Sequence, residues 1–339
     1  MRLNEIIKAL SIPVFTKYDT KLLFEDDKIF VNSNVMNAIF TNVEENLPGC
    51  CLSLASAKAL VNYTADAKTM IKDGNLVISS KGTRLKIPVL DDEVLKIDKR
   101  YSDESFTLTD EFIISLSKCL KYTIMDSDEP RFSQIYLKNR TMFSSNRTAI
   151  ICCTQQPGIE LSLSNSFACQ IIQSLYKLTN DIKLWSNQFI ALQSKDMYCE
   201  ITAIESDTQP FDIDDIVLKY IGDKQKIPFE LITQLIDVVK MGNEFGATEN
   251  YQIQAKFIPG KILISTNTGK NQISKTIVAK HKIDYCIIIN KMQAEMLPTF
   301  FESDTVVEVI GRVKDRILIC ISDNKTKFYT PAMIGNNNG

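Results

Sequence analysis

Most of the chain alternates apolar and polar residues with a period of two, and only a few stretches show the period of an amphipathic helix. Residues 53–64, SLASAKALVNYT, predict a short helix with Ser53 or Ser56 as its N-cap. Three short strands are expected after it, with hairpin turns at the Asp-Gly and Lys-Gly pairs between them. This part of the chain therefore predicts one helix followed by a three-stranded meander.

The same order recurs along the chain. A helix capped by Thr109 or Asp110 is expected next, and strands follow it. With a weaker start at residues 4–15, we expect six units of one helix plus strands, and the remaining helices are predicted over residues 165–180, 228–243 and 290–303. The fold class is therefore α+β.

The six units pair into three similar domains, each made of two half-units. The predicted domains are residues 1–100, 101–212 and 213–334, and residues 335–339, GNNNG, are expected to form a disordered tail. A length of 339 residues agrees with two or three domains of ordinary size.

A short string, DDEVLK at residues 91–96, returns as DDIVLK at residues 214–219. A match of this kind is expected about once by chance in a chain of this length, so its position decides whether it matters. Each copy follows the last strand of a second half-unit and leads into the next domain. Pro88 and Pro210 precede the copies, as expected where an extended linker leaves a sheet edge. We interpret the copies as two equivalent, extended linkers.

Composition is that of an ordinary globular protein, with 45% hydrophobic residues, 24% charged residues and a formal net charge of −2. No global basic field would attract nucleic acid, so any such contact must come from local patterning. The N-terminus lacks the features of a secretion signal, and no apolar run approaches the about 20 residues of a membrane span, so a cytoplasmic protein is expected.

The residues that usually carry catalysis are sparse. The nine cysteines include the adjacent pairs Cys50-Cys51 and Cys152-Cys153, a spacing that suits neither a normal disulfide nor a zinc site, so reduced core cysteines are expected. His281 is the only histidine, which excludes a histidine-based triad, and nucleotide-binding and hydrolase motifs are absent. We expect a binding protein without enzymatic activity, metal or cofactor.

One acidic run, FDIDD at residues 211–215, is a possible exception. On a strand Asp212 and Asp214 would share a face and could hold Mg²⁺ in a nuclease or nucleotidyl transferase. The run lies in a linker, however, and no second carboxylate cluster accompanies it. A metal-dependent nucleic-acid enzyme is therefore the less favoured alternative.

The six-unit order over nearly the whole length resembles a DNA polymerase sliding clamp of the bacterial beta-subunit type. Four stretches carry the resemblance locally: SSKGTRLKIPVLDDE, MFSSNRTAII, DTQPFDIDDIVLKYI and KFYTPAMI. The loop at Ser144 to Thr148 departs from the family's usual Thr-Asp-Gly-His-Arg, and the chain continues past the closing strand. These departures suggest a divergent clamp of phage or other mobile-element origin.

The resemblance implies a ring. Two three-domain subunits would close head to tail as a homodimer around duplex DNA, with helices lining the hole. Such a ring is a processivity factor that tethers a DNA polymerase topologically and without sequence-specific contacts. The polymerase and a clamp loader would dock short hydrophobic peptides into a pocket between the second and third domains. A monomeric or open viral-type processivity factor is the alternative within this fold.

Two sets of residues follow from the resemblance. Helix-face cations and one loop arginine would meet the DNA phosphates. These candidates are Lys58, Lys118, Lys121, Arg131, Lys177, Lys240 and Lys291. Arg140 and Arg147 are further loop candidates, although Arg147 also matches the pocket loop. The predicted peptide pocket comprises Ser144, Arg147, Ala149, Val217, Tyr220, Phe328, Thr330, Pro331 and Met333. Val217 and Phe328 could instead be ordinary core residues.

Overall fold

The computed structural model describes residues 1–45, 47–62, 67–80, 82–91, 93–100, 102–125, 127–165, 167–179, 181–186, 189–202, 210–245, 250–268, 271–301 and 304–335. The chain separates into two compact units. Unit 1 comprises Met1–Leu120, Ser133–Ile135 and Glu160–Asp207, and unit 2 comprises Lys121–Phe132, Tyr136–Ile159 and Thr208–Gly339. The three-domain division stays a prediction.

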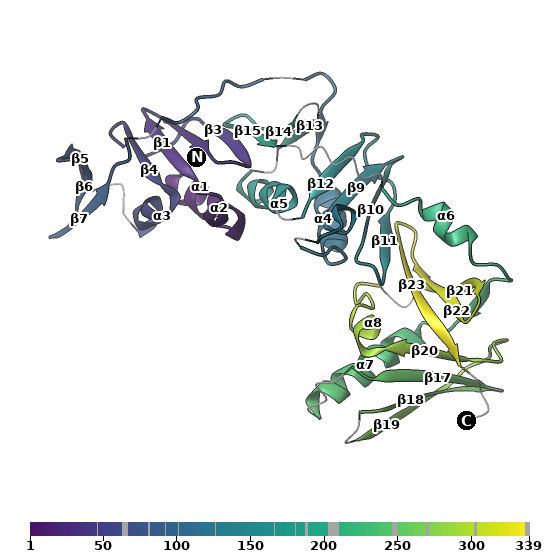
Figure 1. The fold of residues 1–339 in the computed structure, drawn as a ribbon. Coiled ribbons are helices and arrows are strands. Elements are labelled where there is room, and N and C mark those ends of the chain that lie inside the picture. The colour runs from purple at the N-terminus through teal and green to yellow at the C-terminus, as the bar shows by residue number, and fades with distance from the viewer. Residues whose placement is uncertain are drawn as a thin grey trace. The chain divides into compact units, whose positions relative to one another are not determined.

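Unit 1 is built on an antiparallel eight-stranded sheet in the order β4-β1-β2-β3-β15-β14-β13-β8 (Figure 1). Its two halves meet where β3 pairs with β15, from Met36↔Ile201 to Phe40↔Met197. The strands are β1 (Lys21–Glu25), β2 (Lys28–Asn32), β3 (Met36–Phe40), β4 (Cys50–Ser53), β8 (Phe106–Thr107), β13 (Lys183–Ser186), β14 (Phe189–Gln193) and β15 (Met197–Thr202); β12 (Leu161–Ser164) also belongs to this unit.

The helices of unit 1 pack as one layer against one face of this sheet (Figure 1). Side chains tie the layer together: Ser174 Oγ donates to the Ala9 carbonyl oxygen at 2.6 Å, and Gln173 Nε2 donates to Ser117 Oγ at 2.8 Å. Ser53 caps its helix as predicted, because its side chain accepts from the Ser56 N–H. The helices are α1 (Leu3–Leu10), α2 (Pro13–Lys17), α3 (Leu54–Ala57) continued by the 3₁₀ helix η1 (Lys58–Asn62), α4 (Asp110–Leu120) and α5 (Ala168–Leu178).

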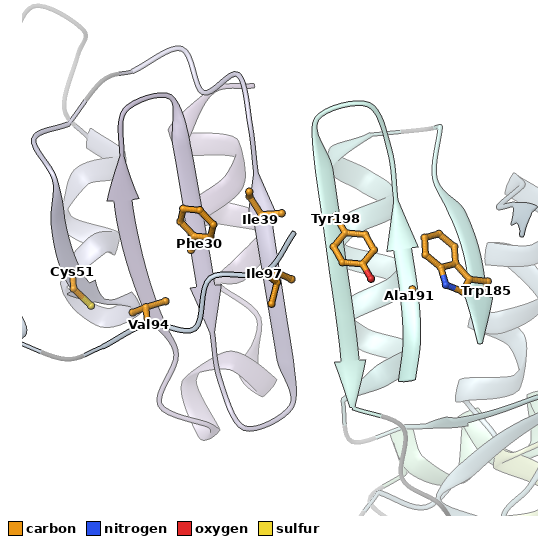
Figure 2. Close-up of a cluster of buried hydrophobic side chains, with 8 residues drawn as sticks. All are labelled: Phe30, Ile39, Cys51, Val94, Ile97, Trp185, Ala191 and Tyr198. Carbon is orange, nitrogen blue, oxygen red and sulfur yellow. The ribbon is translucent and has the colours of Figure 1, made fainter. Parts of the chain in front are cut away.

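Residues 93–100, which begin inside the first DD string, cross the opposite face of the sheet (Figure 2). Val94 and Ile97, each 8% exposed, pack with Phe30, Trp185 and Tyr198 of the strands. Three cations fix the segment: Lys96 Nζ lies 2.6 Å from Glu25 Oε1, Lys99 Nζ donates to the Lys195 carbonyl oxygen at 2.6 Å, and Arg100 Nε lies 3.6 Å from Glu200 Oε1. Trp185, which is 4% exposed, is a core residue of this face.

A separate three-stranded sheet, β5-β6-β7, completes unit 1. Its strands are the predicted meander, β5 (Lys68–Lys72), β6 (Asn75–Ser80) and β7 (Thr83–Pro88). β6 is the central strand, so β5 and β7 each have one edge without a partner among the described residues.

Unit 2 contains a long antiparallel sheet in which β23 is the central connection. β23 pairs with β11, β22 and β20, and the order runs β9-β10-β11-β23-β20-β17-β18-β19, with β22, β21 and β16 joined to the side of β23. The strands are β9 (Gln134–Lys138, of which the last three residues belong to unit 2), β10 (Thr141–Ser145), β11 (Ile150–Cys153), β16 (Gln225–Ile227), β17 (Gln252–Ile258), β18 (Lys261–Asn267), β19 (Gln272–Val278), β20 (Cys286–Asn290), β21 (Val306–Val313), β22 (Arg316–Ser322) and β23 (Thr326–Gly335). The helices are η2 (Pro130–Phe132), α6 (Ile213–Leu218), α7 (Glu230–Glu244) and α8 (Lys291–Glu295).

Several sequence predictions need correction. The second DD string is helical, in α6, and not an extended linker. α8 ends at Glu295, well before the predicted end, and Gly335 belongs to β23 and not to a tail, while residues 336–339 lie outside the described part. The short strands β4, β8 and β16 were not predicted. Among the described residues, no helix is long and apolar enough to cross a membrane.

Candidate functional site

The outer face of β9, β10, β11 and β23 carries the most distinctive side chains of unit 2. Residues alternate along β23: Phe328 and Thr330 are buried, whereas Lys327 is exposed and Tyr329 half-buried. In register with these, Tyr136, Phe143 and Cys152 form an apolar cluster with Tyr329 on the outer face. The two faces of the sheet therefore differ: one packs into the core, and the other presents an aromatic surface.

Helix α6 lies across this outer face. Asp212 is its N-cap and accepts from the Asp215 N–H at 3.0 Å. Ile213 then packs on the Tyr136–Phe143–Cys152 cluster, and Val217 and Tyr220 pack on a second cluster of Ile310, Leu318 and Cys320. The far end is held by paired backbone hydrogen bonds between Ile221 and Arg312, where a Cβ on Gly311 would meet the Tyr220 carbonyl oxygen at 2.5 Å. Glycine at 311 thus permits this close approach.

A cavity of about 590 Å³ opens beside the start of α6. Its floor is aromatic and apolar, with Phe143, Cys152, Ile213 and Tyr329. Charges of both signs surround it: Lys138 and Lys327 come from the strands, and Asp212 and Asp214 come from α6. An apolar floor with a few polar groups is typical of a binding pocket.

Next to this cavity lies a cluster of five side chains, Glu129, Arg131, Phe132, Arg147 and Phe211, which we name the arginine–phenylalanine cluster. The Phe132 and Phe211 rings are 5.3 Å apart. The Arg131 guanidinium lies 5.1 Å from the Phe132 ring and 5.4 Å from the Phe211 ring, and the Arg147 guanidinium lies 5.3 Å from the Phe132 ring. Both arginines share one carboxylate, because Glu129 is 2.6 Å from Arg131 Nη2 and 3.2 Å from Arg147 Nη2. Cation–π contact and ion pairing thus hold five residues from three segments together.

The conformation of the loop at residues 146–149 determines the position of Arg147. Asn146 Oδ1 accepts from the N–H groups of Thr148 and Ala149, which closes a tight loop. Arg147 itself adopts φ +73°, a conformation that favours glycine. The loop therefore holds Arg147 in a left-handed backbone conformation, with its guanidinium 5.3 Å from the Phe132 ring.

Burial shapes the electrostatics of this surface. It raises the pKa of Tyr136 to about 12, while the nearby Arg131 charge acts in the opposite direction. The Tyr136 hydroxyl is buried and has no hydrogen-bond partner among the described residues. Burial, together with the neighbouring thiols of Cys153 and Cys320, also raises the pKa of the Cys152 thiol, which stays neutral. The surface thus holds an unused hydroxyl donor and two guanidiniums against one carboxylate.

The structure divides the predicted pocket residues between the two faces. Ser144, Ala149, Phe328 and Thr330 are buried, and Thr330 Oγ1 donates to the Thr148 carbonyl oxygen at 3.1 Å. The others are accessible to different degrees: Val217, Tyr220 and Pro331 are half-buried, and Arg147 and Met333 are exposed. That these nine residues form a pocket stays a prediction.

The predicted DNA-facing cations of unit 1 lie in its helix layer. Lys58 is on η1, Lys118 on the last turn of α4 and Lys177, which is exposed, on the last turn of α5. Lys177 also lines a groove of about 430 Å³ between α5 and α1 together with Lys8, which the sequence analysis did not single out. In this unit the helix face does carry repeated positive charge.

The corresponding cations of unit 2 have mixed surroundings. Lys121 follows α4 in the sequence and Lys240 lies on α7, and both are exposed. The Lys291 side chain is only 14% exposed, with its Nζ 3.8 Å from Glu295 Oε1 and 5.7 Å from the centre of the Tyr251 ring. Arg131 belongs to the arginine–phenylalanine cluster. Contact of these residues with DNA stays a prediction.

The acidic run has a structural role in α6. Asp212 caps the helix, and Asp214 and Asp215 occupy its first turn, where the helix dipole stabilises negative charge. Within the described ranges, no group of three or more His, Cys, Asp or Glu side chains is arranged to hold a metal ion.

Sequence reasoning missed several residues of this surface. Glu129, Phe211 and Tyr136 were not singled out, nor was Tyr329. The alternation along KFYTPAM could have placed Tyr329 opposite Phe328, because side chains two apart on a strand share a face. Nothing local links Phe211 to Phe132, since 79 positions of chain separate 132 from 211.

Comparison with solved structures identifies the fold. The DNA polymerase III beta subunit of Thermotoga maritima matches with a TM-score of 0.74 at 12% identity, over 98% of this chain and 96% of that chain. Caulobacter crescentus pol III beta matches with a TM-score of 0.74 at 14% identity, over 98% of each chain. The Helicobacter pylori beta clamp bound to a DNA ligase peptide matches with a TM-score of 0.71 at 10% identity, over 98% and 97%. Neither a protein-family model nor a curated protein sequence matches the chain. The chain has the fold of bacterial sliding clamps, and the fold predicted from the sequence is confirmed.

Proposed function

We propose that this protein is a DNA sliding clamp, a processivity factor that encircles duplex DNA and tethers a DNA polymerase. The observation that carries the proposal is the clamp fold, which extends over nearly the whole chain. The repeated lysines of the unit 1 helix layer support it, because a sliding ring needs sparse, sequence-independent attraction to phosphates. In this function the protein acts in the cytoplasm, or in the host cytoplasm if a phage encodes it, and catalyses no reaction itself.

Ring closure would use free strand edges in a head-to-tail homodimer. β19 ends the long sheet of unit 2, and its Val278 is 87% exposed. In unit 1, β5 has an open edge and carries Met70 and Ile71, which are 55% and 44% exposed. An open edge that carries exposed apolar side chains is suited to pairing with another chain.

Partner proteins would dock short peptides on the outer face of unit 2. The cavity beside α6 and the arginine–phenylalanine cluster support this, since together they offer an aromatic floor, open space and charged groups at the margin. The Helicobacter pylori relative was solved with such a peptide, from DNA ligase. For this chain we propose the polymerase and the clamp loader as the owners of these peptides.

The ring is tested on nicked circular DNA. The protein is loaded onto the circle by the cognate loader or by spontaneous opening, isolated by gel filtration, and the DNA is then cut once. Retention on the circle and loss after the cut, for a protein whose solution mass is that of a dimer, is the expected result. A monomeric mass, or binding that ignores the cut and falls only with salt, would instead indicate an open factor held by charge.

The proposed edges have their own test. Val278→Asp places a charge at the end of β19, within the proposed contact, and should shift the mass of the protein toward the monomer, whereas Val306→Asp, at a 38% exposed position of β21, should not. Equal effects of both changes would show that the free edge of β19 is not the contact.

A further inference from the structure

The arginine–phenylalanine cluster has more hydrogen-bond donors than acceptors. Two guanidiniums face one carboxylate, Glu129, and the nearby Tyr136, a residue only 4% exposed, has a buried hydroxyl without a hydrogen-bond partner among the described residues. A buried hydroxyl without a partner is costly, so this group is poised for an acceptor. The cluster therefore contains more positive than negative charge, with two guanidiniums and one carboxylate.

The contact with Glu129 is easily exchanged. The side chains of Glu129, Arg131 and Arg147 are 43%, 46% and 52% exposed. Ion pairs at such exposure contribute little net stability, so a second carboxylate can replace Glu129 at little cost. The guanidinium planes stay in place meanwhile, because they also lie over the rings of Phe132 and Phe211.

The surroundings select the kind of anion. The rings of the cluster adjoin the apolar floor of the cavity, since Phe211 lines both. At the cavity margin Asp212 and Asp214 offset the charges of Lys138 and Lys327, so the cavity offers no net attraction to a chain of phosphates, whereas a single carboxylate next to an apolar side chain needs only the two arginines. Planar, forked guanidiniums fit a carboxylate well.

We propose that the cavity beside α6 and the arginine–phenylalanine cluster form a docking surface for a peptide in which an acidic residue stands beside an apolar anchor. The carboxylate of the peptide takes the place of Glu129 on Arg131 and Arg147. The anchor enters beside Phe132 and Phe211. This inference rests on the proposed docking function. It also assigns Arg131 to partner binding and not to DNA, and it makes Glu129 an internal substitute for the carboxylate of the partner.

A random dodecapeptide library displayed on phage provides the probe. It is selected in parallel on the full-length protein, on Arg131→Gln/Arg147→Gln, on Phe132→Ala and on a matched control, Lys226→Gln/Lys282→Gln, which removes the same charge from exposed positions of unit 2. We expect peptides with Asp or Glu within two residues of an apolar anchor on the wild type and on the control, and loss of that acidic preference on the arginine variant. Circular dichroism establishes that each variant is folded.

Measured affinities then test whether the surface recognises the acidic residue. The best peptide and its version with Asn or Gln in place of the acid are labelled, and their binding is measured by fluorescence polarisation at two salt concentrations. The acidic peptide should bind the wild type about 5- to 10-fold more tightly at low salt, and the variant Arg131→Gln/Arg147→Gln should bind both alike.

Three outcomes would overturn the inference, and they are distinguishable. Peptides enriched without acidic preference leave the docking function intact and refute the recognition of an acid. If no peptide is enriched more strongly on the wild type than on Phe132→Ala, docking at this surface is refuted. Loss of binding to a labelled duplex oligonucleotide on Arg131→Gln/Arg147→Gln, but not on the lysine control, would show that the arginines serve nucleic acid.

Discussion

Replacing Phe328 by alanine tests the assignment of the two faces of β23. Phe328 is fully buried, and its ring centre lies 5.1 Å from that of Tyr122. A buried aromatic side chain removes about 150–250 Å² from water, which at about 25 cal/mol per Å² corresponds to about 4–6 kcal/mol. Alanine retains part of this and the unfolded chain is not fully extended, so we expect Phe328→Ala to lower the free energy of unfolding by about 3–5 kcal/mol.

Met333→Ala is the matched control on the same strand. Met333 is 46% exposed on the opposite face, so its truncation should cost less than about 1 kcal/mol. Both residues were predicted to line a peptide pocket, and the structure separates their roles: Phe328 supports the sheet, and only Met333 is accessible to a partner.

The assay is urea unfolding followed by two signals. Far-UV circular dichroism reports both units, whereas fluorescence of Trp185, the only tryptophan of the chain, reports unit 1. Phe328→Ala should lower the midpoint of the transition of unit 2 with an unchanged slope. A loss below about 1 kcal/mol, or an equal loss for Met333→Ala, would show that the alternation along β23 has been assigned to the wrong faces.

Three further changes test other parts of the structure. Gly311→Ala would force the new Cβ against the Tyr220 carbonyl oxygen and should destabilise unit 2 by about 2 kcal/mol or more in urea unfolding; a neutral effect would contradict the close approach of α6 to β21. Asp212→Ala removes the N-cap of α6 and should cost about 1 kcal/mol, most of which Asp212→Asn should restore; equal losses would mean that charge and not capping matters. Burial raises the pKa of the Cys50 and Cys320 thiols from 9.0 to about 11, so between these pH values the native state retains protons that the unfolded chain releases. The stability that the neutral thiols contribute is therefore fully present below pH 9 and is lost as the pH rises through about 11. Urea midpoints between pH 7.5 and 11 should fall more steeply for the wild type than for Cys50→Ala/Cys320→Ala, and parallel curves would refute the assignment.

Local patterns predicted most of the order of helices and strands, but not the short strands β4, β8 and β16 or the helix α6. The cap at Ser53, the meander β5-β6-β7 and the repeated helix-plus-strands order are all as predicted, because each depends on residues close in sequence. The resemblance to sliding clamps predicted more of the fold than periodicity alone. Periodicity does not specify which distant strands pair, and β3 with β15 and β11 with β23 join strands more than 100 positions apart, as Ile150↔Tyr329 illustrates.

The helix α6 shows where the reading of local signals failed. Asp212 is a good N-cap, acidic residues follow in the first turn, and Ile213, Val217 and Tyr220 are spaced for one helix face. These signals were present, but Pro210 and the position between two domains favoured an extended linker. The cluster of Arg131 with Phe211 was beyond prediction for a different reason, because nothing in either segment specifies the other.

The two DD strings show what six residues can and cannot specify. Val94 and Val217 occupy the same position of the string, and both pack against the outer face of a sheet; the next residues, Leu95 and Leu218, are 56% and 75% exposed. Yet residues 93–100 have no regular structure and 213–218 form a helix. The string thus determines which side chains face the sheet, and the contacts that follow determine the backbone. Side-chain ion pairs of Lys96 and Arg100 hold residues 93–100 against the strands, whereas the backbone groups of α6 are satisfied within its own turns.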